Sequence, residues 1–316
     1  MSKINISLIL GLMFVFVACN DDPISPSNGN TTNSNANSNA SLMGNADTRS
    51  NGSIVTLGTV QAVSEGNLSL REVASRMEMP RLQGGNRNLF IVHTVPTYGV
   101  NYCMDYSYDL RAQYWVAFRW DKSNSVKNTT RTDAWSADPL IPTAYQTDYS
   151  DHSGNGYTRG HMVASEDRVN SVAANQQTFY YSNIHPQSYD FNTDGIWWHI
   201  ENKVLRNVFN QDGFRDTLYV VKGGTIDPGN YKMVNKLPVP KYFFMAVLCK
   251  KNSNPSLGGY KAIGFWMEHK SNTDTNYKSY AVSIDKLEQL TGFDFFCNLP
   301  DELEEKIESS LVTSLW

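Results

Sequence analysis

The chain has 316 residues, of which 41% are hydrophobic, 12% aromatic and 18% charged. This aromatic content excludes wholesale disorder, and the length allows one large domain or two modest ones. A formal net charge of −4 excludes a protein that binds nucleic acid through bulk positive charge. It does not exclude an enzyme that acts on nucleic acid at a local site.

The N-terminus has the pattern of an export signal. Lys3 precedes an apolar run at residues 8–18, which is too short to span a bilayer but suits a signal-peptide core. The segment FVAC, ending at Cys19, resembles a bacterial lipobox, in which the cysteine is lipidated. We therefore predict a signal peptide at 1–18 and a membrane anchor at Cys19. The protein would be an exported lipoprotein, periplasmic or on the outer membrane or cell surface; an ordinary secretory signal is the alternative.

The segment that follows is polar. Asn (9) and Ser (7) fill 16 of the 34 positions from 20 to 53. Such a composition cannot bury enough apolar surface to offset the entropy of the chain. Residues 19–53 are therefore predicted to be a flexible linker that holds a globular body away from the membrane.

Three cysteines lie beyond Cys19, namely Cys103, Cys249 and Cys297. Their spacings match no zinc pattern. In an oxidising compartment they allow either one disulfide and a free thiol or three buried thiols.

The body begins with a helix signal and continues with strand-like runs. Ser69 and Glu72 have the spacing of a capping box, an apolar helical face follows, and Pro80 ends it. Runs rich in aromatic and β-branched residues then predict strands at 88–95, 114–120, 217–221, 242–249 and 262–267. Two further helices are predicted at 196–210 and 300–311. Because regular βαβ alternation is missing, the pattern favours an α+β domain with a central sheet.

Charge is unevenly distributed along the body. The balance is +4 over residues 111–131, +5 over 232–251 and −6 over 285–308. Solvated faces are the simplest explanation of such runs. The functional interpretation is a basic rim that receives a polyanion, with the acidic helix elsewhere.

The segment from 155 to 206 carries the residue types of a phosphodiester hydrolase. Arg159 and His161 share a face if their segment is extended, and Gly160 between them permits a close approach. A neutral His suits the activation of water, an amide oxygen such as that of Asn192 suits a hard cation, and Arg suits phosphate. Singly, each residue also has a structural explanation: a buried His, a helix cap at Asn192 and a solvated helix residue at Glu201.

The combination resembles the sugar-non-specific DNA/RNA endonucleases of the ββα-metal type, the endonuclease G-like family. The family motifs correspond here to TRGH (158–161), SNIHPQ (182–187) and NTDGIWWHIE (192–201). The resemblance runs from about Met77 to TGFDFF (291–296), about three quarters of the chain.

The resemblance implies a ββα-metal nuclease fold, a central mainly antiparallel sheet flanked by helices. It implies Mg²⁺, with Mn²⁺ as an alternative, bound directly by Asn192. His161 would be the general base, with an ordinary pKa near 6.5 if unperturbed. Glu201 would hold metal-bound water and Arg159 would stabilise the phosphate, while Asn183 would support the site.

Two departures from the family pattern are present. Thr158 replaces the usual Asp, and the stretch after Asn192 is one residue longer, which we assign to the turn at 193–195. The additional histidines, His185 and His199, are interpreted as structural.

The prediction is an exported endonuclease whose DNA/RNA non-specific endonuclease domain spans 77–316, preceded by a short N-terminal extension at 54–76. DNA and RNA would be its substrates. One rival is a non-catalytic surface lipoprotein that binds nucleic acid or glycan. The other is a secreted toxin nuclease with a cognate inhibitor.

Overall fold

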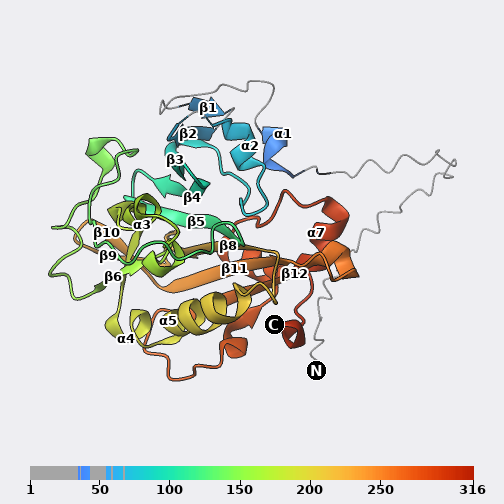
Figure 1. Ribbon diagram of the computed structural model, residues 1–316. Coiled ribbons are helices and arrows are strands. Elements are labelled where there is room, and N and C mark those ends of the chain that lie inside the picture. Colours follow the sequence, from blue (N-terminus) through green and yellow to red (C-terminus); the bar gives the residue numbers. More distant parts are fainter. Residues whose placement is uncertain (1–34, 36, 43–54, 58–59, 67) are drawn as a thin grey trace, which may run out of the picture. The chain divides into compact units, whose positions relative to one another are not determined.

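The computed structural model describes residues 35, 37–42, 55–57, 60–66 and 68–316 (Figure 1). The predicted signal peptide and Cys19 lie outside the described residues. Within the described part of the chain, no helix is long and apolar enough to cross a bilayer.

A nine-stranded sheet forms the centre of the body, in the order β1-β2-β3-β4-β5-β8-β11-β12-β13 (Figure 1). Its strands are β1 (Val55–Leu57), β2 (Val60–Ser64), β3 (Gly85–Val95), β4 (Gly99–Ser107), β5 (Ala112–Asp121), β8 (Thr217–Gly224), β11 (Tyr242–Lys250), β12 (Tyr260–Glu268) and β13 (Ala281–Val282). Only β2 and β3 pair in parallel within it. The predicted α+β class with a mainly antiparallel sheet is therefore confirmed.

Two small antiparallel pairs and several short helices complete the described body. The pairs join β6 (Thr158–His161) to β7 (Ile184–Gln187) and β9 (Tyr231–Val234) to β10 (Leu237–Pro240). The α-helices are α1 (Asn39–Leu42), α2 (Leu70–Ala74), α3 (Val172–Gln177), α4 (Tyr189–Asn192), α5 (Ile196–His199), α6 (Ile284–Thr291) and α7 (Asp301–Glu308). The π-helical segment η4 (Ile200–Phe209) continues α5 directly. Single 3-10 turns are η1 (Thr143–Tyr145), η2 (Ser165–Asp167), η3 (Tyr181–Asn183), η5 (Ser256–Gly259), η6 (Tyr277–Tyr280) and η7 (Thr313–Leu315).

The sheet separates two apolar cores because successive side chains of a strand point to opposite faces. On β11, Phe243 and Met245 face the helix formed by α5 and η4, which contributes Trp197 to that core. Phe244 and Ala246 face the opposite core. That second core is closed by apolar residues of α2, α6 and α7, including Leu70, Val73, Ile284, Leu287 and Ile307.

Most predicted elements are present with bounds that differ by a few residues. All five predicted strands exist, as β3, β5, β8, β11 and β12, and the predicted helices correspond to α2, to α5 with η4, and to α7. The helix that begins at the Ser69 cap is shorter than its apolar face suggested, since α2 ends at Ala74. Strand β4 was not predicted, because the buried polar residues Asn101 and Asp105 interrupt its apolar pattern.

The segment before residue 77 differs from its prediction in two places. In the predicted linker, Asn39 of α1 is fully buried and donates hydrogen bonds to the carbonyls of Ala74 and Pro80. In the predicted extension, β2 pairs with β3 and so joins the central sheet. The composition argument considered only apolar burial, whereas Asn39 is held by backbone hydrogen bonds.

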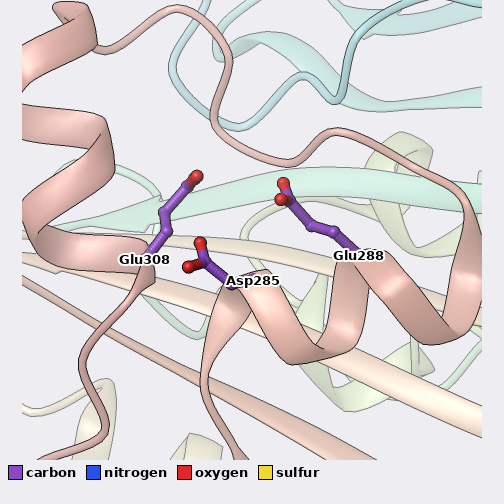
Figure 2. Close-up of side chains that lie close together, drawn as sticks. All are labelled: Asp285, Glu288 and Glu308. Carbon is purple, nitrogen blue, oxygen red and sulfur yellow. The ribbon is translucent and has the colours of Figure 1, made fainter. Parts of the chain in front are cut away.

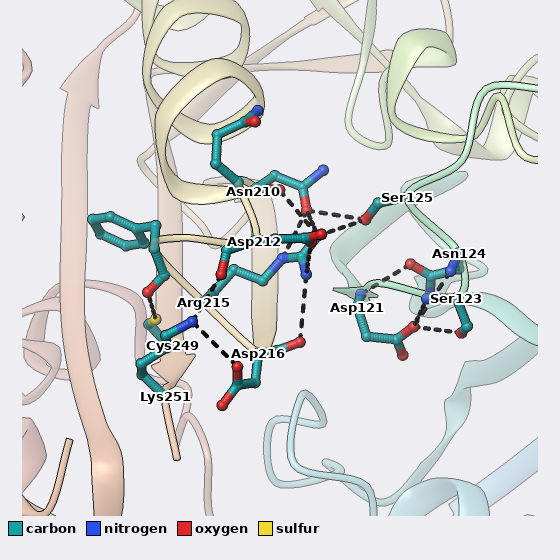
Figure 3. Close-up of polar contacts among 12 residues, drawn as sticks. Asp121, Ser123, Asn124, Ser125, Asn210, Asp212, Arg215, Asp216, Cys249 and Lys251 are labelled. Carbon is teal, nitrogen blue, oxygen red and sulfur yellow. Dashed lines mark hydrogen bonds and ion pairs between the residues drawn. The ribbon is translucent and has the colours of Figure 1, made fainter. Parts of the chain in front are cut away.

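The far end of the helix formed by α5 and η4 is fixed by a buried arginine (Figure 3). Arg215 donates hydrogen bonds to the side chain and the carbonyl of Asn210, and to Ser125 Oγ at 2.9 Å. The carbonyl and the side-chain oxygen of Asn210, at the helix C-terminus, thereby receive hydrogen-bond donors. Cys249 in the same region, like Cys103 and Cys297, is a buried free thiol, so these three form no disulfide with one another.

Candidate active site

The β6–β7 pair and the helices that follow it form one wall of a cavity of about 360 Å³. The register pairs Arg159 with Pro186 and His161 with Ile184, and the turn at 193–195 separates α4 from α5. Four of the five residues predicted for the site line this cavity, namely Arg159, His161, Asn192 and Glu201. The other lining residues are Arg131, Ala164, Ser165, Glu166, Thr193, Trp198, Asn202 and Arg206.

His161 is held neutral by its surroundings. Burial lowers its pKa to about 3, and the nearby positive charges of Arg131 and Arg159 act in the same direction. The backbone carbonyl of Arg159 accepts a hydrogen bond from the ring. Nε2 is out of contact with water and has no hydrogen-bond partner among the described residues. The pKa of His161 in the free protein therefore lies well below the value near 6.5 that holds for an unperturbed ring.

Two arginines of the cavity are packed on aromatic rings. The guanidinium of Arg159 lies 4.0 Å from the ring centre of Trp135, and that of Arg131 lies 4.7 Å from Phe179. Trp135 and Phe179 also contact the ring of His161, each at 5.2 Å between ring centres. The same aromatic residues thus fix the positions of the imidazole and of both positive charges.

Asn192 is oriented by the residue that departs from the family motif. Its Nδ2 donates to Thr158 Oγ1 at 2.9 Å, and Thr158 Oγ1 donates to the carbonyl of Gln187 at 2.8 Å. Asn192 Oδ1 accepts no hydrogen bond from the described residues and is the amide atom left for the cavity. Gly160 does permit a close approach, but the space beside it is filled by the side chain of Gln187.

Glu201 belongs to a buried network of charges. Lys222 Nζ lies 2.7 Å from Glu201 Oε1 and 3.2 Å from Asp167 Oδ2, and Arg206 lies 2.6 Å from Asp167 Oδ1. Burial raises the pKa of Glu201, while Lys222 opposes that change. In Asp167 the attraction of Lys222 and Arg206 outweighs burial and lowers the pKa. The structural explanation of Glu201 as a solvated helix residue is therefore wrong.

Asn183 does not line the cavity. Its amide donates to the carbonyls of Val163 and Thr178 and accepts from the Val163 N–H, so all of it is engaged with backbone. It holds the segment after His161 in position. His185 is fully buried and its Nε2 lies 3.1 Å from the Gln113 carbonyl, as expected of a structural histidine.

The sequence interpretation missed Arg131, Trp135, Asp167, Lys222 and Arg206. For Lys222 a signal was present, since a lone lysine in the apolar run of β8 requires a buried partner. Arg131 ends the basic run at 111–131, but nothing in that run distinguishes it from its solvated neighbours. The positions of Trp135 and Asp167 depend on tertiary contacts alone.

The five lysines of the second basic run do not form one rim. Lys232 and Lys241 line a second cavity of about 460 Å³, together with Tyr157, which directly precedes β6. Lys250 and Lys251 lie at the opposite end of β11, where Lys251 pairs with Asp216 at 3.3 Å (Figure 3). Lys236 pairs with Asp151 at 3.1 Å.

In a comparison with known protein families, the motif residues between 158 and 201 all fall within a single match. Residues 90–302 match the model of the DNA/RNA non-specific endonuclease family, well over half of the chain. The chain belongs to that family. It is accordingly an endonuclease, and the recognition made from its motifs is confirmed.

Relatives and a solved structure are consistent with this membership. A nuclease of Nostoc sp. is 29% identical over 215 residues, which cover 66% of this chain and 76% of the relative. The mitochondrial nuclease EXOG of Xenopus laevis is 27% identical over 63% of this chain and 58% of its own length. The structure of an EndoG/EndoGI complex has a TM-score of 0.55 and 22% identity, covering 64% of this chain and 85% of that chain. The last likeness concerns the fold alone.

The family is metal-dependent, and the residues of this endonuclease fit a divalent cation. Asn192 Oδ1 and the Glu201 oxygen that is not bonded to Lys222 are oxygen donors on the cavity wall. Hard cations prefer such ligands.

Proposed function

We propose that this endonuclease hydrolyses phosphodiester bonds of both DNA and RNA, with Mg²⁺ as cofactor and Mn²⁺ as a substitute. The observation that carries the proposal is the state of His161, whose neutral ring presents an unpartnered Nε2 beside Asn192, Glu201 and Arg159. Contacts centred on phosphate carry no base information, so cleavage would have little sequence preference.

In this mechanism His161 Nε2 accepts the proton of the attacking water. The low pKa of the free protein rises when a phosphate anion enters, because a negative charge stabilises the imidazolium ion. Arg159 and Arg131 donate to phosphate oxygens, and their aromatic contacts keep the guanidinium groups in place. Asn192 would hold the metal and Glu201 would accept hydrogen bonds from nearby water. When bound, the metal supplies positive charge against the developing negative charge of the reacting phosphate.

The test is cleavage of plasmid DNA and of a structured RNA, with Mg²⁺ and with excess chelator. We expect both substrates to be cut only with the divalent cation. Retained cleavage in chelator would contradict the metal requirement. Binding of either substrate without any cleavage would favour the non-catalytic surface lipoprotein instead.

We also propose that the protein is exported and anchored through Cys19, as supported by the lipobox-like segment and the polar stretch after it. The mature protein should then partition into detergent and carry acyl groups, and Cys19→Ala should block processing or release it. A wild-type protein recovered from cells in soluble form with an unmodified Cys19 would contradict anchoring.

A further inference from the structure

A second group of carboxylates lies on α6 and α7, among residues that do not line the cavity beside β6 and β7. Asp285 and Glu288 belong to α6, and Glu308 is the last residue of α7 (Figure 2). One oxygen from each carboxylate lies within 4.8 Å of the other two. These residues belong to the acidic run at 285–308, and for Glu308, which is buried, the interpretation as a solvated face is wrong.

Glu308 is the residue that a solvated acidic face does not explain. It is 4% exposed, and its Oε1 has no hydrogen-bond partner among the described residues. Burial is the main reason that the pKa of Glu308 is raised to about 11. The negative charges of Glu288, Glu304, Asp294 and Asp285 raise it in the same direction. An unpaired buried carboxylate of this kind requires either a proton or a cation.

The positive and polar groups nearby serve other carboxylates of the region. Asn37 donates to Asp294 and Glu304; burial raises the pKa of both of those carboxyls, and the charge of Arg81 opposes that rise. Glu288 accepts a hydrogen bond from the Phe295 N–H at 2.7 Å, yet burial still raises its pKa to about 7. The described residues thus leave the cluster of Asp285, Glu288 and Glu308 without a lysine or arginine partner.

The three oxygens lie close enough together for one divalent cation to contact all of them. Ca²⁺–oxygen distances of about 2.3–2.6 Å allow ligands on opposite sides of the ion to lie about 4.6–5.2 Å apart. Mg²⁺ instead requires nearly ideal octahedral geometry and retains several waters. Three carboxylates that can each bind through one or two oxygens also match the high and flexible coordination number of Ca²⁺.

We propose that Asp285, Glu288 and Glu308 bind a structural Ca²⁺ ion that fastens the end of α7 to α6. The ion would take the place of the proton on the buried Glu308 carboxyl, which is released to water, and would join two helices that close the second core of the sheet. This site is separate from the metal of the proposed nuclease reaction, since none of its residues lines that cavity. Its role would be stability of the C-terminal part of the body.

The experiment measures the thermal midpoint of the full chain at neutral pH, first in chelator and then with excess Ca²⁺. The wild type should gain about 5–10 °C at a Ca²⁺ concentration 100-fold above the dissociation constant. Glu308→Gln should lose this gain, while in chelator it should be about as stable as the wild type, because the buried wild-type carboxyl is then protonated and Gln is its neutral counterpart. Glu288→Gln provides the same test from the other helix. Glu305→Gln, on the exposed side of α7, is the matched control and should keep the gain.

Asn192→Ala separates this site from the nuclease metal, because it should keep the full Ca²⁺ response. Isothermal titration with Ca²⁺ should then count one site in Asn192→Ala and lose that site in Glu308→Gln. If Ca²⁺ does not raise the thermal midpoint of the wild type, the cluster holds protons instead of a cation. The same conclusion follows if Glu308→Gln and Glu288→Gln gain as much as the wild type. An equal gain with Mg²⁺ would contradict the preference for Ca²⁺.

Discussion

The polar residues of the site differ in how many of their hydrogen-bonding atoms are already used. Asn183 is saturated by backbone groups and lies outside the cavity. Asn192 uses its N–H on Thr158 and keeps Oδ1, and His161 uses one ring nitrogen on the Arg159 carbonyl and keeps Nε2. The atoms kept free are those that a metal ligand and a general base need. This distinction separates the two asparagines, which the motif alone does not.

The low pKa of His161 predicts an unusual pH profile. If the neutral ring is the active form, as proposed, kcat/KM should not fall as pH drops through 6.5, because the pKa of His161 in the free protein is about 3. Arg131→Gln removes a neighbouring positive charge, so the pKa of His161 should rise and the acid limb should move toward neutral pH. The exposed substitution Lys122→Gln should leave the limb unchanged. A wild-type limb near pH 6.5 would contradict the burial argument.

The contact between Thr158 and Asn192 predicts that a substitution at Thr158 changes the Mg²⁺ requirement and not the maximal rate. Thr158→Val removes the acceptor that orients the amide, so the Mg²⁺ concentration for half-maximal activity should rise about 10–100-fold. The rate at saturating Mg²⁺ should change little. Thr158→Asp restores an acceptor and the family residue, and should keep a requirement close to that of the wild type. An unchanged requirement in Thr158→Val would mean that another contact orients Asn192.

At the scale of elements, the charge network joins parts of the chain that are distant in sequence. Lys222 of β8 contacts Glu201 of η4 and Asp167 of η2, and all three are buried. A buried charge left without its partner is strongly destabilising. The network therefore fixes the helix that carries Glu201 against the central sheet.

Removing the lysine should destabilise the fold markedly. Lys222→Met leaves two buried carboxylates without their shared cation, and should lower the free energy of unfolding by about 3–5 kcal/mol. Adding Glu201→Gln should recover part of this loss because one of the two charges is removed. The measurement is denaturant unfolding, with Lys122→Met expected to lie within about 0.5 kcal/mol of the wild type. A loss for Lys222→Met as small as that of the control would contradict the network.

The sequence predicted the elements whose signals are local. The apolar runs of β3, β5, β8, β11 and β12 specify strands without reference to the rest of the chain. Strand β4 has buried polar residues, and α1 is held by Asn39 through hydrogen bonds, so neither has a local apolar signal. The motif residues of the site were identified from their resemblance to the family, but Lys222 and Arg131 reach it only through tertiary folding.

At the scale of the whole described body, the lysines of the second basic run are spread over β9, the turn to β10 and the two ends of β11. Lys232 and Lys241 line a cavity together with Tyr157, which directly precedes β6. Linear sequence does not show this separation: Lys241 directly precedes β11 and Lys250 is its last residue, so the strand holds them at its two ends. A basic rim should therefore be a property of one pair and not of all five residues.

The salt dependence of DNA binding should distinguish the two pairs. Replacing Lys232 and Lys241 with Gln should reduce the slope of log Kd against the logarithm of the salt concentration. The reduction should be about 1 for each lysine that contacts phosphate. Neutralising Lys250 and Lys251 should leave the slope unchanged. If both double substitutions change the salt slope equally, the two pairs of lysines do not differ in their contact with DNA. If neither changes the slope, the run is only a solvated face.

The most direct test of the account is single-turnover cleavage of plasmid DNA by His161→Ala at saturating Mg²⁺. If His161 is the general base, the rate should fall about 10²–10⁴-fold, while the thermal midpoint and the Mg²⁺ requirement stay near those of the wild type. Asn192→Ala, measured beside it, should instead raise the Mg²⁺ requirement. A rate for folded His161→Ala close to that of the wild type would contradict the mechanism.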